Sequence, residues 1–152
     1  MRPKRIVINR DKCTGCRLCE TRCTLHHYAE VNPLRSRIRI KKDDSVGLDI
    51  PMVCRQCKKP ACVLACPNKA ITQNKETGVI FVDVEKCEGT GACLNACPYD
   101  IVRIDPITRN ALICDLCNGD PECVKWCFTR AIVFEEDLLD RGKGGGFAIT
   151  GM

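Results

Sequence analysis

The chain has 152 residues, of which 15 are cysteine, about one in ten, whereas an ordinary soluble domain carries only a few. Aromatic residues supply only 5% of the chain, so a conventional hydrophobic core is excluded as the main source of stability. The formal net charge is +5 and is unevenly spread: residues 1–42 hold 12 Lys and Arg against 3 Asp and Glu, and residues 43–152 hold 12 against 16.

The segments between the cysteines predict short elements. In chain order, β-branched runs bounded by turn residues predict strands at 5–9, 37–41, 79–82, 101–104, 111–113 and 132–134. Brief helices are expected at 18–23, 61–65, 92–96 and 122–126. The predicted fold class is therefore α+β, with tandem bacterial-ferredoxin-like repeats built around metal clusters. The glycine-rich end, 140–152, is expected to be a flexible tail.

The cysteines fall into four groups whose spacing repeats. In every group the last gap is three residues, and in three groups the first gap is two residues. The groups are Cys13, Cys16, Cys19 and Cys23; Cys54, Cys57, Cys62 and Cys66; Cys87, Cys93 and Cys97; and Cys114, Cys117, Cys123 and Cys127.

This spacing favours iron–sulfur clusters over the two other ways of stapling a small fold. Three thiolates on one short loop can bind three irons of one cubane, and a fourth cysteine three residues later can reach a second cluster. Zinc sites more often use C-x2-C pairs separated by a dozen or more residues. Disulfides need an oxidising compartment, and an odd number of cysteines leaves one unpaired.

The ends and the apolar stretches of the sequence indicate location. Residues 1–11, MRPKRIVINRD, contain no apolar segment of the kind that a secretory signal needs. No run approaches the roughly 18 apolar residues of a membrane-spanning helix. We therefore expect a cytoplasmic protein with reduced thiols and no membrane span.

The strings CTGCRLCETRC, CRQCKKPACVLACP, CEGTGACLNACPY and CDLCNGDPECVKWC resemble the four cysteine groups of a known family. The family is that of the four-cluster, polyferredoxin-like electron-transfer subunits of the dimethyl sulfoxide reductase type. The resemblance runs from about residue 12 to residue 132. The opening segment, CTGCRLCETRCTLHH followed by NPLRSRIRI, is most similar to the small subunits of tungsten aldehyde oxidoreductases and benzoyl-CoA reductases.

The resemblance implies a nested ligand pairing and a matching domain organisation. An inner two-cluster module at about 50–105 would lie within an outer one formed by about 1–49 and 106–139. The implied ligand sets are Cys13, Cys16 and Cys19 with Cys127; Cys114, Cys117 and Cys123 with Cys23; Cys54, Cys57 and Cys62 with Cys97; and Cys87 and Cys93 with Cys66. The alternative pairs neighbouring groups, first with second and third with fourth.

The third group lacks one cysteine, and Thr90 stands at that position. The five-residue gap between Cys87 and Cys93 equals the usual spacing with one ligand replaced. A neutral hydroxyl is a poor iron ligand beside thiolates, so three outcomes remain open. The cluster has three irons, it keeps a fourth iron bound by water, Glu88 or Asp100, or it is missing. We expect three [4Fe-4S] clusters and one that is [3Fe-4S] or atypically ligated [4Fe-4S].

Together these features predict a protein that transfers single electrons and is not itself an enzyme. The sequence carries no phosphate-binding loop, dinucleotide motif or nucleophile with a base. The expected partners are a larger catalytic oxidoreductase subunit of the molybdenum or tungsten type and a flavoprotein. Nucleic acid is not expected, because aromatic residues do not alternate with the basic ones. A free soluble ferredoxin and a zinc-binding structural module are the alternatives. His26 and His27 are expected to be ordinary loop residues and not ligands.

Overall fold

The computed structural model describes residues 4–136, and the expected tail at 140–152 lies outside them. In chain order the elements are β1 (Lys4–Ile8), η1 (Arg10–Lys12), α1 (Leu18–Tyr28), η2 (Pro33–Arg35), β2 (Ile38–Asp43), β3 (Leu48–Val53), α2 (Ala61–Ala65), β4 (Ile71–Gln73), β5 (Ile80–Val82), α3 (Ala92–Ala96), β6 (Arg103–Ile104), β7 (Ala111–Leu112), η3 (Leu116–Gly119), α4 (Glu122–Lys125) and β8 (Ile132–Glu136). The strands pair into four two-stranded antiparallel sheets.

The mixed helix and strand composition agrees with the sequence prediction, with two differences. Helix α1 runs on to Tyr28, five residues beyond its expected end, so His26 and His27 lie in its last turn and not in a loop. Strands β3 and β4 were not predicted. Strand β3 contains Pro51, which a two-stranded sheet tolerates because each of its strands is an edge.

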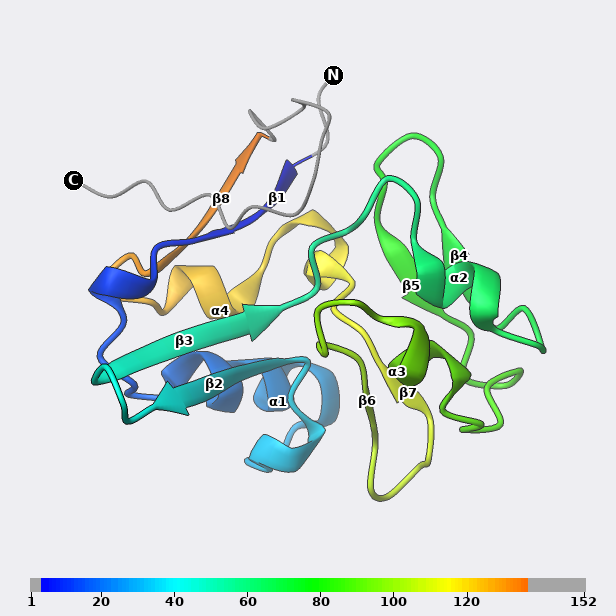
Figure 1. Ribbon diagram of the computed structural model, residues 1–152, viewed down its shortest axis with the longest axis horizontal. Helices are drawn as coiled ribbons and strands as arrows, with labels where there is room; N and C mark the ends of the chain where they lie inside the picture. Colours follow the sequence, from blue (N-terminus) through cyan, green and yellow to red (C-terminus); the bar gives the residue numbers. More distant parts are fainter. Residues whose placement is uncertain (1–3, 137–152) are drawn as a thin grey trace.

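The chain folds into two halves that occupy opposite ends of its long axis (Figure 1). The outer half contains 4–53 and 114–136: strands β1 and β8 pair along five residues, and α1 packs against α4. The inner half contains 54–113, where α2 packs against α3 beside two short hairpins. Hairpins β2–β3 and β6–β7 each lie whole within one half.

The two inner hairpins are closed by the same turn chemistry. The Asn74 side chain accepts hydrogen bonds from the N–H groups of residues 76 and 77, and the Asp105 side chain accepts one from the N–H of residue 107. Each turn ends with a left-handed residue, Gly78 in the first and Arg109 in the second. Short polar side chains that bond to nearby backbone N–H groups stabilise such turns locally.

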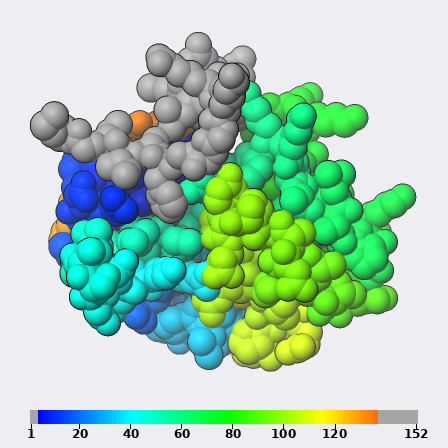
Figure 2. Space-filling view, viewed as in Figure 1, coloured from blue at the N-terminus to red at the C-terminus, as the bar shows by residue number. Residues whose placement is uncertain are grey.

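A single apolar cluster runs through both halves and includes buried cysteines. Its most enclosed members are Ile38, Val53, Ile71, Ile80, Leu116 and Ile132. In the space-filling view, the N-terminal segments and the middle of the chain occupy opposite ends of the visible face (Figure 2). Within residues 4–136, no helix has the length and apolar character needed to cross a membrane.

Candidate metal centres

The fold collects the cysteines into four sets, which we name sites A to D. Sites A, B and D each line a cavity of their own, and the thiols of site C interact electrostatically with one another. Site A contains Cys13, Cys16, Cys19 and Cys127; site B contains Cys23, Cys114, Cys117 and Cys123; site C contains Cys54, Cys57, Cys62 and Cys97; and site D contains Cys66, Cys87 and Cys93 with Thr90.

The composition of each set follows from the packing of the helices. The last cysteine of each group follows or lies within a helix that packs against the helix of another group. Because α1 packs against α4, Cys23 reaches the fourth loop and Cys127 reaches the first. Because α2 packs against α3, Cys66 reaches the third loop and Cys97 reaches the second.

All four loops bend in the same way just before their second ligand position. Gly15, Gln56, Gly89 and Leu116 precede Cys16, Cys57, Thr90 and Cys117, and each has a φ between 50° and 66°. Residues other than glycine are strained in this left-handed conformation. The bend at Gln56 and Leu116 is therefore not a consequence of glycine being present, and it recurs because the loops share one conformation. The loop around Thr90 therefore keeps the backbone conformation of the complete loops.

Backbone N–H groups point at several of the sulfur atoms. The N–H groups of Arg37, Ala70 and Ala111 each lie with their nitrogen 3.3 Å from the Sγ of Cys23, Cys66 and Cys87, respectively. The N–H of Leu116 lies 3.4 Å from the Sγ of Cys114. Thiolates that bind a cluster commonly accept such hydrogen bonds, which stabilise the negative charge on sulfur.

Burial and crowding change the acidity of the thiols in these sets. All 15 cysteines are unpaired in the described part of the chain. Burial, together with neighbouring cysteines in the same set, raises the pKa of Cys54 to about 12 and that of Cys62 to about 11. Without a metal these thiols stay protonated at neutral pH, and metal coordination displaces the proton and leaves a thiolate. The donor sets therefore fit iron–sulfur clusters, whose irons take cysteine thiolates as ligands.

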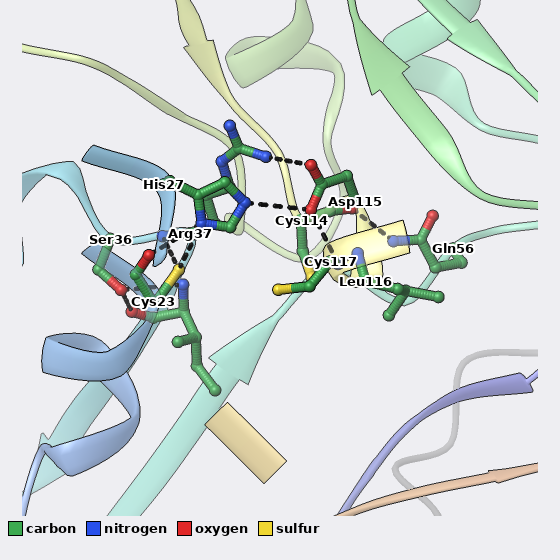
Figure 3. Close-up of polar contacts among 10 residues, drawn as sticks. Cys23, His27, Ser36, Arg37, Gln56, Cys114, Asp115, Leu116 and Cys117 are labelled. Atoms are coloured by element: carbon green, nitrogen blue, oxygen red, sulfur yellow. Dashed lines mark hydrogen bonds and ion pairs between the residues drawn. The ribbon is translucent and has the colours of Figure 1, made fainter. Parts of the chain in front are cut away.

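Site B is held by a polar network that joins distant segments (Figure 3). The Asp115 carboxylate accepts hydrogen bonds from Arg37 Nη1 at 2.7 Å, His27 Nε2 at 3.2 Å and the Cys117 N–H at 3.0 Å. The other ring nitrogen of His27, Nδ1, lies 2.8 Å from the Cys23 carbonyl oxygen and 3.9 Å from the Cys23 Sγ. These contacts fix two cysteines of site B relative to each other.

The same network sets the charge state of its members. Burial alone would lower the pKa of His27, but its hydrogen bonds to Asp115 and Cys23 outweigh burial and raise the pKa to about 9. Burial would raise the pKa of Cys23, but hydrogen bonds from His27 and from the Arg37 N–H bring it below its ordinary value. The network thus favours a thiolate at Cys23.

Three arginines at alternating positions of the basic N-terminal segment pair with aspartates. Arg37 pairs with Asp115 as described, and Arg39 hydrogen-bonds the side chain and the carbonyl of Asp100. Arg35 reaches the buried Asp105, with its Nε and Nη2 at 2.9–3.1 Å from the two carboxylate oxygens. These three basic residues of the N-terminal segment therefore form ion pairs with carboxylates from the C-terminal part of the chain.

Sites A, B and C are successive neighbours, and sites C and D share helices α2 and α3, each of which contains a cysteine of one site and is followed by a cysteine of the other. Cys19 of site A interacts electrostatically with Cys123 of site B, and Cys54 of site C does so with Cys114 of site B. Gln56, between two cysteines of site C, donates its side-chain N–H to the Cys114 carbonyl at 2.6 Å. The other amide atom of Gln56, Oε1, accepts from the Ile80 N–H at 2.8 Å. Gln56 thus bridges the loops of sites B and C across the boundary between the halves.

Sequence reasoning missed the polar residues that hold these sites. His27 was expected to be an ordinary loop residue, but it contacts Cys23 and Asp115. His26 and His27 also have ring nitrogens within 4.8 Å of Cys117 Sγ. The four-residue spacing between Cys23 and His27 was a usable signal, because residues four apart share one face of a helix.

Comparison with known proteins gives the family. Residues 47–137 match the family described as a 4Fe-4S dicluster domain, so the chain belongs to this family. The chain is 44% identical over 122 residues to the polyferredoxin-like subunit of an aliphatic sulfonate oxidoreductase from Pyrococcus furiosus, covering 80% of this chain and 70% of the relative. It is 34% identical over 161 residues to the electron transport protein HydN of Escherichia coli, covering 91% and 89%.

A solved structure shows the same fold. The active-site complex BamBC of benzoyl coenzyme A reductase, with benzoyl-CoA bound, contains a chain that is 30% identical, with a TM-score of 0.54 over 90% of this chain and 81% of that chain. The relatives therefore include electron-transport proteins and a subunit of an oxidoreductase. These findings confirm the prediction of an iron–sulfur protein of the electron-transport class, and they confirm part of the family resemblance.

Proposed function

We propose that the protein is a non-catalytic electron-transfer subunit that passes single electrons along four iron–sulfur clusters, one in each of sites A to D. The observation that carries this proposal is the succession of the four sets within one molecule, in which Cys19 is near enough to Cys123, and Cys54 to Cys114, to raise the pKa of that neighbour. Because electron tunnelling falls steeply with distance, closely spaced clusters in a row form a conduit.

In this proposal all 15 cysteines are cluster ligands, paired in the nested manner. Sites A, B and C each offer four thiols and would hold [4Fe-4S] clusters. Site D offers three thiols, and we propose a [3Fe-4S] cluster there, because the loss of one thiolate corner most simply loses one iron. By that argument the potential of site D lies above those of its neighbours.

We further propose that the chain serves a larger catalytic subunit of the molybdenum or tungsten type that acts on aldehydes or acyl-CoA compounds. The similarity to a chain of the benzoyl coenzyme A reductase complex and to a subunit of an aliphatic sulfonate oxidoreductase supports a role inside an oxidoreductase complex. A flavoprotein or another soluble acceptor would take the electrons at the other end, in the cytoplasm.

The first test is a measurement of iron and acid-labile sulfide per chain, with electron paramagnetic resonance, on anaerobically purified protein. We expect about 15 irons and an oxidised three-iron signal, since three four-iron clusters and one three-iron cluster hold that number. Zinc without labile sulfide would overturn the proposal in favour of a structural module. Elution without a larger chain in native size exclusion would instead favour a free ferredoxin.

The nested pairing has its own test. Replacing Cys13 or Cys127 with serine is expected to remove the same resonance signal, because both line the cavity of site A. Pairing of neighbouring groups predicts instead that Cys127→Ser and Cys87→Ser affect a common cluster. Serine at Cys16, the exposed cysteine of site A, is the matched control for ligand loss without burial effects.

A further inference from the structure

The cavity of site D has one corner without a thiol. Its lining includes the three cysteines of the site together with Glu88 and Thr90. Gly89 and Gly91, on either side of Thr90, have φ values of +66° and +77°, so the backbone still bends around this corner. Both Glu88 and Thr90 are exposed, whereas Cys93 is buried. The incomplete corner therefore faces solvent, and part of the rest of the site is enclosed.

The structure distinguishes between the two carboxylates near this corner. Asp100 does not line the cavity, and its carboxylate pairs with Arg39 at 3.1 Å. Glu88 does line it and follows directly on the ligand Cys87. Among residues 4–136, the Glu88 carboxylate has no hydrogen bond or ion pair that would hold it elsewhere. Glu88 is thus the anionic oxygen donor that is available at the corner.

We infer that the Thr90 corner is an exchangeable site for a divalent metal ion, at which the Glu88 carboxylate and solvent take the place of the missing thiolate. This inference rests on the proposed three-iron cluster at site D. Three cluster sulfides would bind one side of the ion, so borderline ions such as Fe²⁺, Co²⁺ and Zn²⁺ suit the site. A carboxylate binds such ions less firmly than a thiolate, so the corner ion exchanges while the thiolate-bound irons stay.

The exchange step balances in charge and electrons. An oxidised three-iron cluster, [3Fe-4S]⁺, first takes one electron, from a neighbouring cluster in the complex or from dithionite in the experiment, and becomes [3Fe-4S]⁰. The reduced cluster then binds one Fe²⁺ and becomes [4Fe-4S]²⁺. Oxidation and a chelator reverse the step and release one Fe²⁺. The metal content of site D, and hence its potential, would therefore follow the free divalent metal concentration.

The test uses the full chain with its clusters under anaerobic conditions. The protein is reduced with dithionite, incubated with ⁵⁷Fe²⁺, desalted and examined by Mössbauer spectroscopy and metal analysis. We expect about one ⁵⁷Fe per chain, loss of the three-iron resonance signal, and recovery of that signal after oxidation with a chelator. Absence of ⁵⁷Fe, with the three-iron signal intact, would overturn the inference while leaving the proposed electron-transfer function in place.

Three variants locate the site. Glu88→Gln is expected to weaken the apparent affinity for Fe²⁺ by at least about tenfold, since loss of even an outer-shell partner commonly costs that much. Glu85→Gln, a nearby exposed residue that does not line the cavity, should leave the affinity unchanged. Thr90→Cys should hold a fourth iron permanently and take up no label.

The remaining outcomes are equally decisive. An unaltered affinity in Glu88→Gln would overturn the role of the carboxylate. Label in more than one position per chain would overturn the restriction to one corner. If Cys87→Ser changes neither the iron content nor the resonance spectrum, site D holds no cluster, and both the four-cluster proposal and this inference fail together.

Discussion

The outer and inner halves of the molecule use one cysteine pattern but are held together differently. The inner half is contiguous in sequence, and its hairpins close through local turns at Asn74 and Asp105. The outer half joins the two ends of the described chain, where β1 pairs with β8. Ion pairs between distant residues, such as Arg37 with Asp115 and Arg22 with Glu122, reinforce this closure.

Because the outer half joins distant segments, the spacing of cysteines along the sequence is not enough to assemble sites A and B. A loop of several residues supplies three cysteines of sites A, B and C and two of site D, but the fourth cysteine of sites A and B comes from about a hundred residues away. Closing a long loop costs more conformational entropy than closing a short one, although the cost rises slowly with length. The outer half therefore depends on specific long-range contacts that the inner half needs less.

The largest expected effect comes from removing one ligand in each half. Cys114→Ser leaves three thiols in site B and should lose about one iron, whereas Cys87→Ser leaves two thiols in site D and should lose the whole proposed cluster, about three irons. Cys114→Ser should keep its sulfides, because a three-iron cluster also carries four, whereas Cys87→Ser should lose about four sulfides. Iron and sulfide analysis checks this, and equal iron losses in the two variants would contradict the difference between complete and incomplete sites.

The next largest effect concerns the ion pair between Arg35 of the outer half and Asp105 of the inner half, which we call the clamp. In Asp105→Asn the buried Arg35 loses its buried partner and keeps only the ion pair with the more exposed Glu30, and removing one member of a buried pair typically costs about 3–5 kcal/mol. For a chain of this size that corresponds to a fall of roughly 10 °C in the temperature of half-unfolding. Circular dichroism and cluster absorbance during heating measure this fall.

The matched control for the clamp is Asp100→Asn. The Asp100 side chain is 85% exposed, so its pair with Arg39 is screened by water. Such a pair contributes about 0–1 kcal/mol, and the unfolding temperature should change little. A similar fall in both variants would mean that the buried clamp is no more important than the exposed pair.

A smaller effect is expected at the bridge between sites B and C. Gln56→Leu leaves the Cys114 carbonyl and the Ile80 N–H without their partner, and an unsatisfied buried polar group costs about 1–3 kcal/mol. Heating experiments should show a loss between those of Asp100→Asn and Asp105→Asn. Gln56→Glu tests the geometry, because it keeps the acceptor for Ile80 and loses the donor to Cys114. Full stability in Gln56→Leu would show that the bridge is unimportant.

The smallest expected change is the effect of mild acid on the stability that the Arg35–Asp105 ion pair contributes. Burial alone would raise the pKa of Asp105, but hydrogen bonds from Arg35 and from the Ile107 N–H outweigh burial and hold the pKa below its ordinary value. The stability from this carboxylate is therefore complete above the ordinary Asp pKa of about 3.9 and is lost only as pH falls through the lower folded value.

The gap in unfolding temperature between the parent and Asp105→Asn should accordingly stay constant between about pH 7 and pH 5, since both lie above the ordinary Asp pKa. Thermal unfolding at the two pH values measures this gap. A gap that already narrows over this range would mean that burial prevails and that the pKa of Asp105 is raised.

Local features of the sequence were enough to predict the chemistry of the cysteine loops and the class of protein. The repeated spacing, the missing cysteine at Thr90 and the short elements are local features, so they could be read from neighbouring residues. Helices α2 and α3 have the bounds expected from sequence. Strand β3 was missed because Pro51 is unfavourable in most strands, and only the two-stranded pairing with Ile40 accommodates it.

The tertiary structure decided everything that joins distant parts of the chain. It brought Cys127 to the first loop and Cys23 to the fourth, it placed three arginines on three aspartates, and it left Glu88 but not Asp100 at the open corner. The physical reason is that the charge of a residue and its position in the sequence limit the kinds of contact that it can make. The packing of helices and strands then selects one partner from many aspartates or cysteines that could make the same contact.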